Sequence, residues 1–211
     1  MIISDNTVVC FDLDDTLYKE IDFFKSGVRF IFRKFLSKHL NLDSPFLRID
    51  SDWFNYVLKN THLTPDQLRQ EYRFHRPILK LSTEARNCIN KLKKQVHSLV
   101  IITDGRSITQ RNKLAALTIN NDFEMVVISE EIGTEKPCLK NYQLVMDKFP
   151  DKEYIYIGDN TNKDFVSPNQ LGWETICLLD DGRNIHHQDF NLEKIYLPKK
   201  CINSLSEIKL V

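Results

Sequence analysis

The chain has 211 residues, of which 42% are hydrophobic and 27% charged, and its formal net charge is zero. This length allows one core domain with a modest insertion, and it excludes two full enzymes. The neutral charge balance argues against nucleic acid or an acidic membrane as a partner, and no apolar stretch approaches the roughly 18 residues that cross a bilayer.

The N-terminus and the cysteines favour a cytoplasmic protein. Residues 1–5 lack the basic region and the long apolar run of a signal peptide. The five cysteines are scattered, without a Cys-x-x-Cys pair, and Cys10 and Cys177 lie in apolar strand candidates. We interpret both as small buried hydrophobic residues in a reducing compartment. The sequence does not determine the oligomeric state.

The first predicted element is a buried strand at residues 8–11, which ends in clustered acids. Asp12 and Asp14 follow it in the segment Asp-Leu-Asp-Asp-Thr-Leu. They project to the same side of an extended chain, because side chains in a strand alternate. Such carboxylates need a cation to offset their repulsion, and Mg²⁺ suits them. The alternative is a polar turn in which an Asp caps a helix.

Residues 18–80 are predicted to form an all-helical insert. Apolar residues at helical spacing predict helices over 21–39 and 50–60, and Thr64 before Pro65 predicts the start of a third. We expect the aromatic residues to form its core: Phe23, Phe24, Phe30, Phe32, Trp53 and Phe54.

The insert is also basic. It contains 12 Lys or Arg and 7 Asp or Glu, a net charge of +5. Its densest basic run, Arg69, Arg73, His75 and Arg76, provides candidates for contact with an anionic substrate. Ordinary charged helix surfaces are the alternative interpretation.

After residue 80 the pattern alternates between helices and strands. Helices are predicted at 82–94, 107–118, 138–148 and 162–171, and strands at 98–102, 123–128, 153–158 and 174–179. This alternation is typical of βαβ units, and it predicts a three-layer α/β/α, Rossmann-like fold with a parallel sheet. Residues 195–197 are a possible edge strand, and residues 204–210 a last helix.

Polar motifs follow three of these strands and occupy one loop. Thr103 to Arg106 come after the second strand, and Gly158-Asp159-Asn160 comes after the fourth, with Asp164 five residues beyond Asp159. Lys136 lies before Pro137 in the intervening loop. Ligands of open parallel sheets bind beyond the carboxyl ends of the strands, so one cleft can hold all these residues.

The order and chemistry of these four motifs resemble the haloacid dehalogenase superfamily, whose members are mostly Mg²⁺-dependent phosphohydrolases. The resemblance spans Asp12 to Asp164. It implies a catalytic core of residues 1–17 and 81–211, and a helical cap of residues 18–80 over the active site. Such a cap can exclude water and select the leaving group.

The resemblance also implies roles for the acids and the lysine. Asp12 is the expected nucleophile and a ligand of Mg²⁺. Asp14 is the expected general acid and base, with its backbone carbonyl facing the metal. Lys136 neutralises Asp12 and the phosphoryl oxygens. Asp159 is the expected third protein ligand of Mg²⁺, after Asp12 and the backbone of Asp14. Asp164 either reaches the metal through water or orients Lys136.

The remaining motif residues are expected near the phosphate. Thr103 matches the hydroxyl that bonds the transferring phosphoryl group, and the backbone amides of Gly105 and Arg106 can add donors. Arg106 can also clamp a second anionic group, with a solvated helix start as the alternative. Asn160 is expected beside the metal, and Asp104 is expected to cap the helix that starts near residue 107.

The sequence therefore predicts a Mg²⁺-dependent phosphatase that cleaves a small phosphorylated metabolite, a sugar phosphate or nucleotide, through an aspartyl-phosphate. Asp14 disfavours dehalogenation, because a halide leaving group needs no proton. A phosphomutase of the same superfamily is the alternative enzyme. The alternative outside enzymes is a non-catalytic binding protein on the same fold. Such a protein is expected to have lost at least one of the catalytic residues, whereas Asp12, Asp14, Lys136 and Asp159 are all present.

Overall fold

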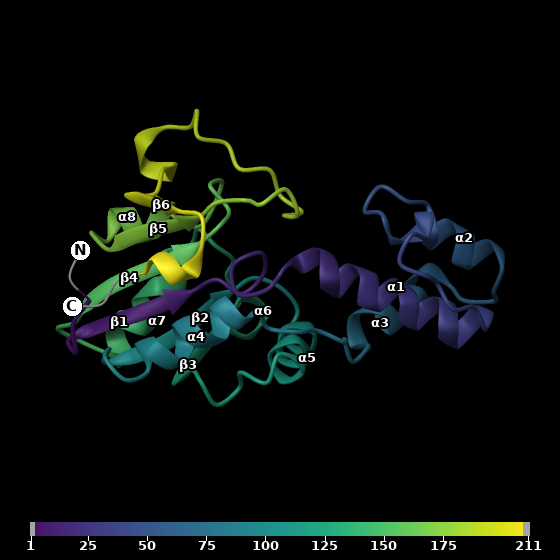
Figure 1. Ribbon diagram of the computed structural model, residues 1–211, viewed down its shortest axis with the longest axis horizontal. Helices are drawn as coiled ribbons and strands as arrows, with labels where there is room; N and C mark the ends of the chain where they lie inside the picture. Colours follow the sequence, from purple (N-terminus) through teal and green to yellow (C-terminus); the bar gives the residue numbers. More distant parts are fainter. Residues whose placement is uncertain (1–2, 209–211) are drawn as a thin grey trace.

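The computed structural model describes residues 3–208, and its centre is a six-stranded parallel sheet (Figure 1). The strand order is β3-β2-β1-β4-β5-β6, and all five neighbouring pairs are parallel. The strands are β1 (Thr7–Phe11), β2 (Ser98–Thr103), β3 (Met125–Ile128), β4 (Glu153–Gly158), β5 (Glu174–Leu178) and β6 (Lys200–Ile202). The predicted parallel α/β fold is confirmed.

Helices cover both faces of the sheet, because alternate side chains of each strand point to opposite faces. In β1, Val9 and Phe11 join one hydrophobic cluster, whereas Val8 and Cys10 join the other. The first cluster includes residues of α4 and α5, and the second includes residues of α7. The helices after the insert are α4 (Thr83–Leu92), α5 (Ser107–Ala116), α6 (Ser129–Ile132), α7 (Lys140–Lys148) and α8 (Val166–Gln170).

The strand order places the carboxyl ends of β1 and β4 side by side. From β1 the chain moves through β2 to β3, and then returns to the other side of β1 with β4 and continues to β6. A crevice forms at such a reversal, beyond the carboxyl ends of the strands. Residues directly after β1 and β4 therefore share one crevice.

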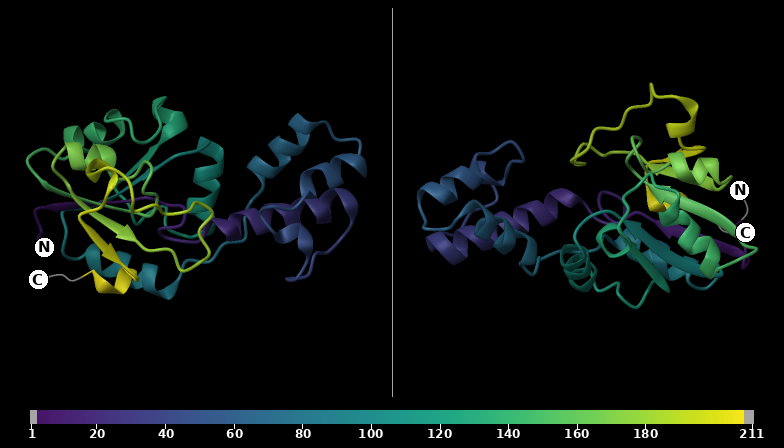
Figure 2. Two further views of the ribbon diagram at one scale, coloured as in Figure 1. Left: turned by 90° about the horizontal axis from the view of Figure 1, so that it is seen from above. Right: turned by 180° about the vertical axis from the view of Figure 1, so that it is seen from behind.

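The helical insert extends beyond this end of the sheet (Figures 1 and 2). It contains α1 (Glu20–Leu36), η1 (Pro45–Leu47), α2 (Trp53–Lys59) and α3 (Pro65–Phe74). Thr64 caps α3 with a capping box, as its side chain accepts a bond from Gln67 N and the Gln67 side chain accepts one from Thr64 N. Gly27 lets α1 approach α3 closely, since a Cβ there would collide with the Tyr72 ring.

The insert has a hydrophobic cluster of its own. Among the predicted core aromatics, Phe24 and Phe32 are buried in it, and Phe30, Trp53 and Phe54 pack against it. Phe23 instead belongs to the cluster on the sheet, because it lies in the first turn of α1, next to the core. The boundaries at residues 17/18 and 80/81 stay a prediction.

Two elements near the C-terminus differ from those predicted. Residues 195–197 do not form the edge strand, which is β6; Lys194–Tyr196 is a 3-10 helix, η2. The Asn169 side chain donates to the carbonyl oxygens of Ile195 and Leu197, both at 2.8 Å, so these groups bond to α8 instead of a strand. The last helix is a 3-10 turn, η3 (Leu205–Glu207), and the rest of that prediction, residues 209 and 210, lies outside the described residues.

Between residues 3 and 208, no helix combines the length and the apolar composition that a membrane span requires.

Candidate active site

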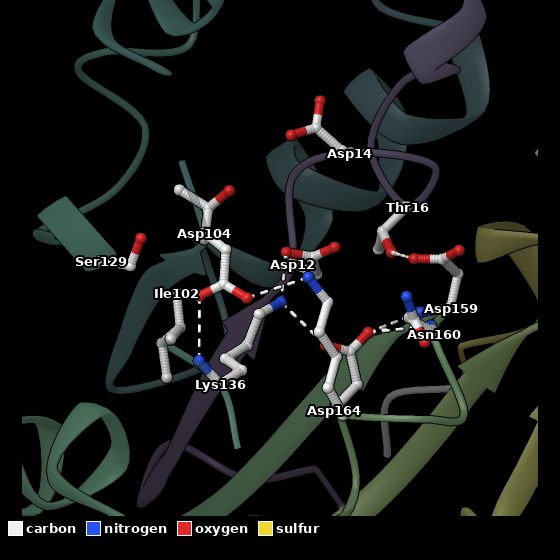
Figure 3. Close-up of polar contacts among 12 residues, drawn as sticks. Asp12, Asp14, Thr16, Ile102, Asp104, Ser129, Lys136, Asp159, Asn160 and Asp164 are labelled. Atoms are coloured by element: carbon white, nitrogen blue, oxygen red, sulfur yellow. Dashed lines mark hydrogen bonds and ion pairs between the residues drawn. The ribbon is translucent and has the colours of Figure 1, made fainter. Parts of the chain in front are cut away.

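Three buried carboxylates and one buried ammonium meet at the carboxyl edge of the sheet (Figure 3). Asp12 follows β1, and Asp159 and Asp164 follow β4. One oxygen of each lies within 4.8 Å of an oxygen of the other two. The Lys136 side chain reaches them from the loop after α6. The structure thus brings together four residues that the sequence placed in three separate motifs, and we call them the aspartate cluster.

Lys136 connects two of the acids. Its Nζ donates to Asp12 Oδ1 and to Asp164 Oδ1, each at 2.7 Å, and to Tyr156 Oη at 3.1 Å. The Lys136 side chain is fully buried. Burial opposes its charge, but the two carboxylates outweigh that effect and hold the pKa of Lys136 well above its usual value. Lys136 is therefore a fixed cation beside Asp12.

Asp164 is held by the backbone as well as by Lys136. Its Oδ2 accepts from Asp159 N at 3.1 Å and from Asn160 N at 2.9 Å. A Cβ at Gly158 would lie 2.5 Å from this Oδ2, so only glycine allows Asp164 to come this close to β4. Both oxygens of Asp164 are thus occupied by protein donors, an arrangement suited to orienting Lys136.

Asp12 and Asp159 carry more negative charge than their surroundings offset. Burial is the largest cause that raises the pKa of Asp12 to about 7; Lys136 opposes the rise and Asp164 adds to it. Burial, followed by the charges of Asp164 and Asp12, raises the pKa of Asp159 to about 9. Closely spaced carboxylate oxygens whose negative charge Lys136 offsets only in part are a donor set that suits Mg²⁺. The residues present therefore fit a magnesium ion.

These raised pKa values predict how the stability of the metal-free protein depends on pH. In the folded state Asp12 and Asp159 hold protons that they have lost in the unfolded state, so the free energy of unfolding should fall as pH rises from about 5 to about 9. Thermal unfolding in EDTA across this range measures the effect. Added Mg²⁺ should restore stability most at high pH, since it binds the deprotonated acids.

Asp159→Asn isolates this effect from other titrating groups. In EDTA at pH 8 the variant should melt about 3–6 °C above the wild type, because a buried acid is replaced by a neutral side chain of the same shape. Exposed Asp147→Asn is the matched control. A variant that loses stability with pH as steeply as the wild type would contradict the raised pKa of Asp159.

Asp14 lies apart from the aspartate cluster and points away from it (Figure 3). Its two oxygens accept bonds from Lys113 Nζ at 2.7 and 2.9 Å, and Gln110 Nε2 donates to Oδ2 at 2.9 Å. Tyr18 Oη donates to Oδ1. Burial alone would raise the pKa of Asp14, but the Lys113 ammonium and these hydrogen bonds lower it. A general acid needs a proton, so that role requires these bonds to be exchanged.

Thr103 and Asp104 of the second motif bond to residues of neighbouring segments. Thr103 ends β2, and its Oγ1 accepts a 2.6 Å bond from Gln110 Nε2. Asp104 does not cap α5, so that prediction was wrong. Its Oδ1 accepts from Lys136 N at 3.0 Å, and its Oδ2 accepts from Lys163 Nζ at 2.9 Å. An acid is tolerated at this position because it fixes the Lys136 backbone and pairs with a cation.

Gly105 and Arg106 lie beside a different cavity from that of the aspartate cluster. Gly105 N donates to Ser129 Oγ at 2.9 Å, and the exposed Arg106 pairs with Glu130 at 2.5 Å. Glu130 also accepts from Ser107 N and so caps the start of α5. Phosphate contact by Gly105 and Arg106 stays a prediction, and it requires these bonds to be exchanged for bonds to the substrate.

The cavity beside the aspartate cluster measures about 80 Å³ and contains residues that the sequence analysis missed. Asn160 lines it, together with Lys163, Glu20 and His186. Lys163 adjoins Asp164 in the fourth motif, so its place in the sequence offered a signal. Glu20 and His186 come from the insert and from a long loop, and no motif marks them.

The basic run of the insert is not gathered at this cavity. Arg69 pairs with Asp66 at 2.9 Å, and Arg73 and Arg76 are exposed. His75 is buried among aromatic rings of the insert, and burial lowers its pKa. His75 therefore packs in the protein interior, although the sequence suggested it as a substrate contact.

Comparison with known proteins gives relatives over most of the chain. The chain is 27% identical to a glyceraldehyde 3-phosphate phosphatase of Methanocaldococcus jannaschii, across 89% of this chain and 92% of that protein. It is 36% identical to the enzyme of that name from Methanopyrus kandleri, across 42% and 39%. It is 30% identical to the pyrimidine 5'-nucleotidase YjjG of Escherichia coli, across 52% and 47%. The chain thus spans nearly all of the first relative and less than half of the other two.

Solved structures share the fold at low identity. The HAD-hydrolase YfnB from Bacillus subtilis superposes with a TM-score of 0.69 at 19% identity, covering 98% of this chain and 97% of that one. A 2-haloacid dehalogenase from Pseudomonas syringae superposes with a TM-score of 0.64 at 18% identity, covering 98% and 96%. A family model described as haloacid dehalogenase-like hydrolase matches residues 9–178. As the motifs indicated, the chain belongs to the haloacid dehalogenase-like hydrolases.

Proposed function

We propose that this protein is a Mg²⁺-dependent phosphatase that hydrolyses a small phosphorylated metabolite. The observation that carries the proposal is the aspartate cluster, in which Lys136 bonds to Asp12 and Asp164 and carboxylate oxygens of Asp12 and Asp159 lie within 4.8 Å of each other. The curated relatives are named as phosphatases of a triose phosphate and of a nucleotide, which supports the same class of substrate.

In this proposal Asp12 attacks the phosphorus atom, and the bond from phosphorus to the leaving oxygen breaks. The product is an aspartyl-phosphate, which water then hydrolyses to return Asp12. Lys136 stabilises the negative charge of the phosphoryl oxygens in the transition state, and Asp164 holds Lys136 in place. A magnesium ion held by Asp12, Asp159 and the backbone of Asp14 would offset the negative charge of nucleophile and phosphate.

Asp14 supplies the proton for the leaving oxygen and later removes one from water. For this role its side chain has to leave Lys113 and turn toward Asp12. Residues 18–80 act as the cap, since α1 begins at Glu20 beside the cavity and can bring the insert over it. Thr103 and Asn160 complete the phosphate site. The free thiols and the proposed substrate class support a cytoplasmic location for the enzyme.

The proposal is tested with a panel of phosphorylated metabolites. Purified protein with Mg²⁺ should release inorganic phosphate from at least one sugar phosphate or nucleotide, and EDTA should stop the release. Products are analysed for isomeric phosphate esters, which a phosphomutase would form. Absence of phosphate release from every compound, with the protein folded and Mg²⁺ present, would contradict the proposed function.

The role of Asp14 predicts a dependence on the leaving group. Asp14→Asn should lower the turnover of an alkyl phosphate about 10²- to 10⁴-fold, because an alkoxide leaves poorly without a proton. The rate of the first step with p-nitrophenyl phosphate should fall less, because nitrophenolate is a good leaving group without a proton. Burst and steady-state rates with both substrates measure the difference. Equal losses in the first step for both substrates would remove the acid role.

A further inference from the structure

A separate cavity, of about 430 Å³, lies along the helical insert and shares no lining residue with the cavity at the aspartate cluster. Its two main walls are α1 and the segment 76–80, which carries the chain from α3 back toward α4; His39 and Leu40, beyond the end of α1, also line it. Ile78 N donates to Ser26 Oγ at 2.8 Å and joins the two walls. These walls are also the two connections between insert and core (Figure 2).

Five cationic side chains line this cavity, which we call the basic groove: Lys25, Arg29, Arg33, Arg76 and Lys80. Asp22 is the one acid among its lining residues. The groove therefore gathers much of the positive charge of the insert, although the whole chain is neutral. The charge is concentrated on one side of α1 and on the return segment.

The three cations of α1 destabilise this helix, because they lie close enough to repel one another. Lys25, Arg29 and Arg33 follow one another at intervals of four residues and so share one helix face. Like charges at this spacing repel one another. Within residues 3–208, none of the five groove cations forms an ion pair, whereas the nearby Lys34 and Arg69 each pair with an acid. Among the lining residues of the groove, only Asp22 offers a counter-charge to these five cations.

The shape and chemistry of the groove indicate its ligand. A volume of this size suits a small molecule better than a polymer. One arginine guanidinium group can bind two oxygens of a phosphate group at once. Because each wall carries arginine, the groove can hold two phosphate groups. Phe30, Leu40 and Ile78 also line the groove, and Ile78 is 85% exposed. They offer an apolar surface to an organic group.

We propose that the basic groove is a second ligand site, for a small organic molecule that carries two or more phosphate groups. A molecule bound there contacts both connections between core and insert, so its binding favours one orientation of the insert. This site is separate from the aspartate cluster, and its existence does not depend on the proposed phosphatase activity.

Binding of ATP, which joins a triphosphate to a flat organic group, tests the proposal. Isothermal titration calorimetry is done in EDTA, so that no metal recruits the probe to the aspartate cluster. The wild type should bind one ATP. Arg29→Glu and Arg76→Glu, one on each wall, should each weaken binding about tenfold or more. Lys59→Glu, an exposed change of the same charge on α2, is the control and should bind as the wild type does.

Two results would overturn the proposal. One is ATP binding that is absent from the wild type, or equally strong in both arginine variants. The other is tighter binding of a single-stranded RNA than of ATP, lost in the same variants, since the groove would then bind a polymer. Circular dichroism of each variant establishes that it is folded. Arg33→Glu, at a more exposed position, replaces Arg29→Glu if that variant does not fold.

Discussion

Asp12→Asn should reduce phosphate release about 10⁴-fold or more, because a carboxamide cannot replace the carboxylate that attacks phosphorus. Asn has nearly the same shape, and its Oδ1 can still accept the bond from Lys136 Nζ. The substitution also removes one of the buried negative charges. The melting temperature in EDTA should therefore stay equal to that of the wild type or rise, while turnover is lost.

The control separates loss of chemistry from loss of structure. Asp147→Asn makes the same change at an exposed position on α7 and should leave both turnover and melting temperature unchanged. Turnover by each variant is measured with a substrate found in the metabolite panel. An Asp12→Asn variant that keeps full activity would remove Asp12 as the nucleophile, and the proposed mechanism with it.

The acids of the site could be predicted because local sequence determines where they lie. Asp12 and Asp159 directly follow apolar runs that form central strands, and β1 and β4 are neighbours in the sheet. In a parallel sheet the ends of neighbouring strands meet at one edge. The position of each acid in the cleft thus follows from the strand it terminates, which a single sequence reveals.

The partners of Asp14 could not be predicted in the same way. Gln110 and Lys113 lie on α5, where Lys113 is 3% exposed although lysine is rarely buried. Which face of α5 turns toward Asp14 is determined by how Leu114 and Leu117 pack against the sheet. That rotation is a property of the tertiary structure, and no local motif encodes it. The restraint on Asp14 is therefore visible only in three dimensions.

Edge elements were also difficult to predict, for a different reason. β6 has only three residues, and two of them are exposed, so it lacks the apolar run of a buried strand. The apolar run at residues 195–197 was the stronger local signal. Its carbonyl groups bond to Asn169, which is distant in sequence. Short edge strands depend on such long-range bonds more than on their own composition.

Lys136→Met should destabilise the protein by about 3–5 kcal/mol and abolish phosphate release, because it leaves buried carboxylates without their cation. The Lys136 ammonium bonds to Asp12 and to Asp164, and neither side chain is more than 8% exposed. Urea unfolding in EDTA measures the loss of stability. Lys94→Met, on the surface after α4, is the control and should change stability little.

A double variant shows whether the loss comes from uncompensated charge. Adding Asp164→Asn to Lys136→Met removes one of the unpaired carboxylates, so part of the lost stability should return while activity stays absent. Asp164→Asn alone should be destabilising, because it weakens the bond to Lys136 Nζ at 2.7 Å and the two bonds from the backbone amides of Asp159 and Asn160. If the two single losses simply add in the double variant, Lys136 and Asp164 are not coupled. The lysine would then act in catalysis without being held by Asp164.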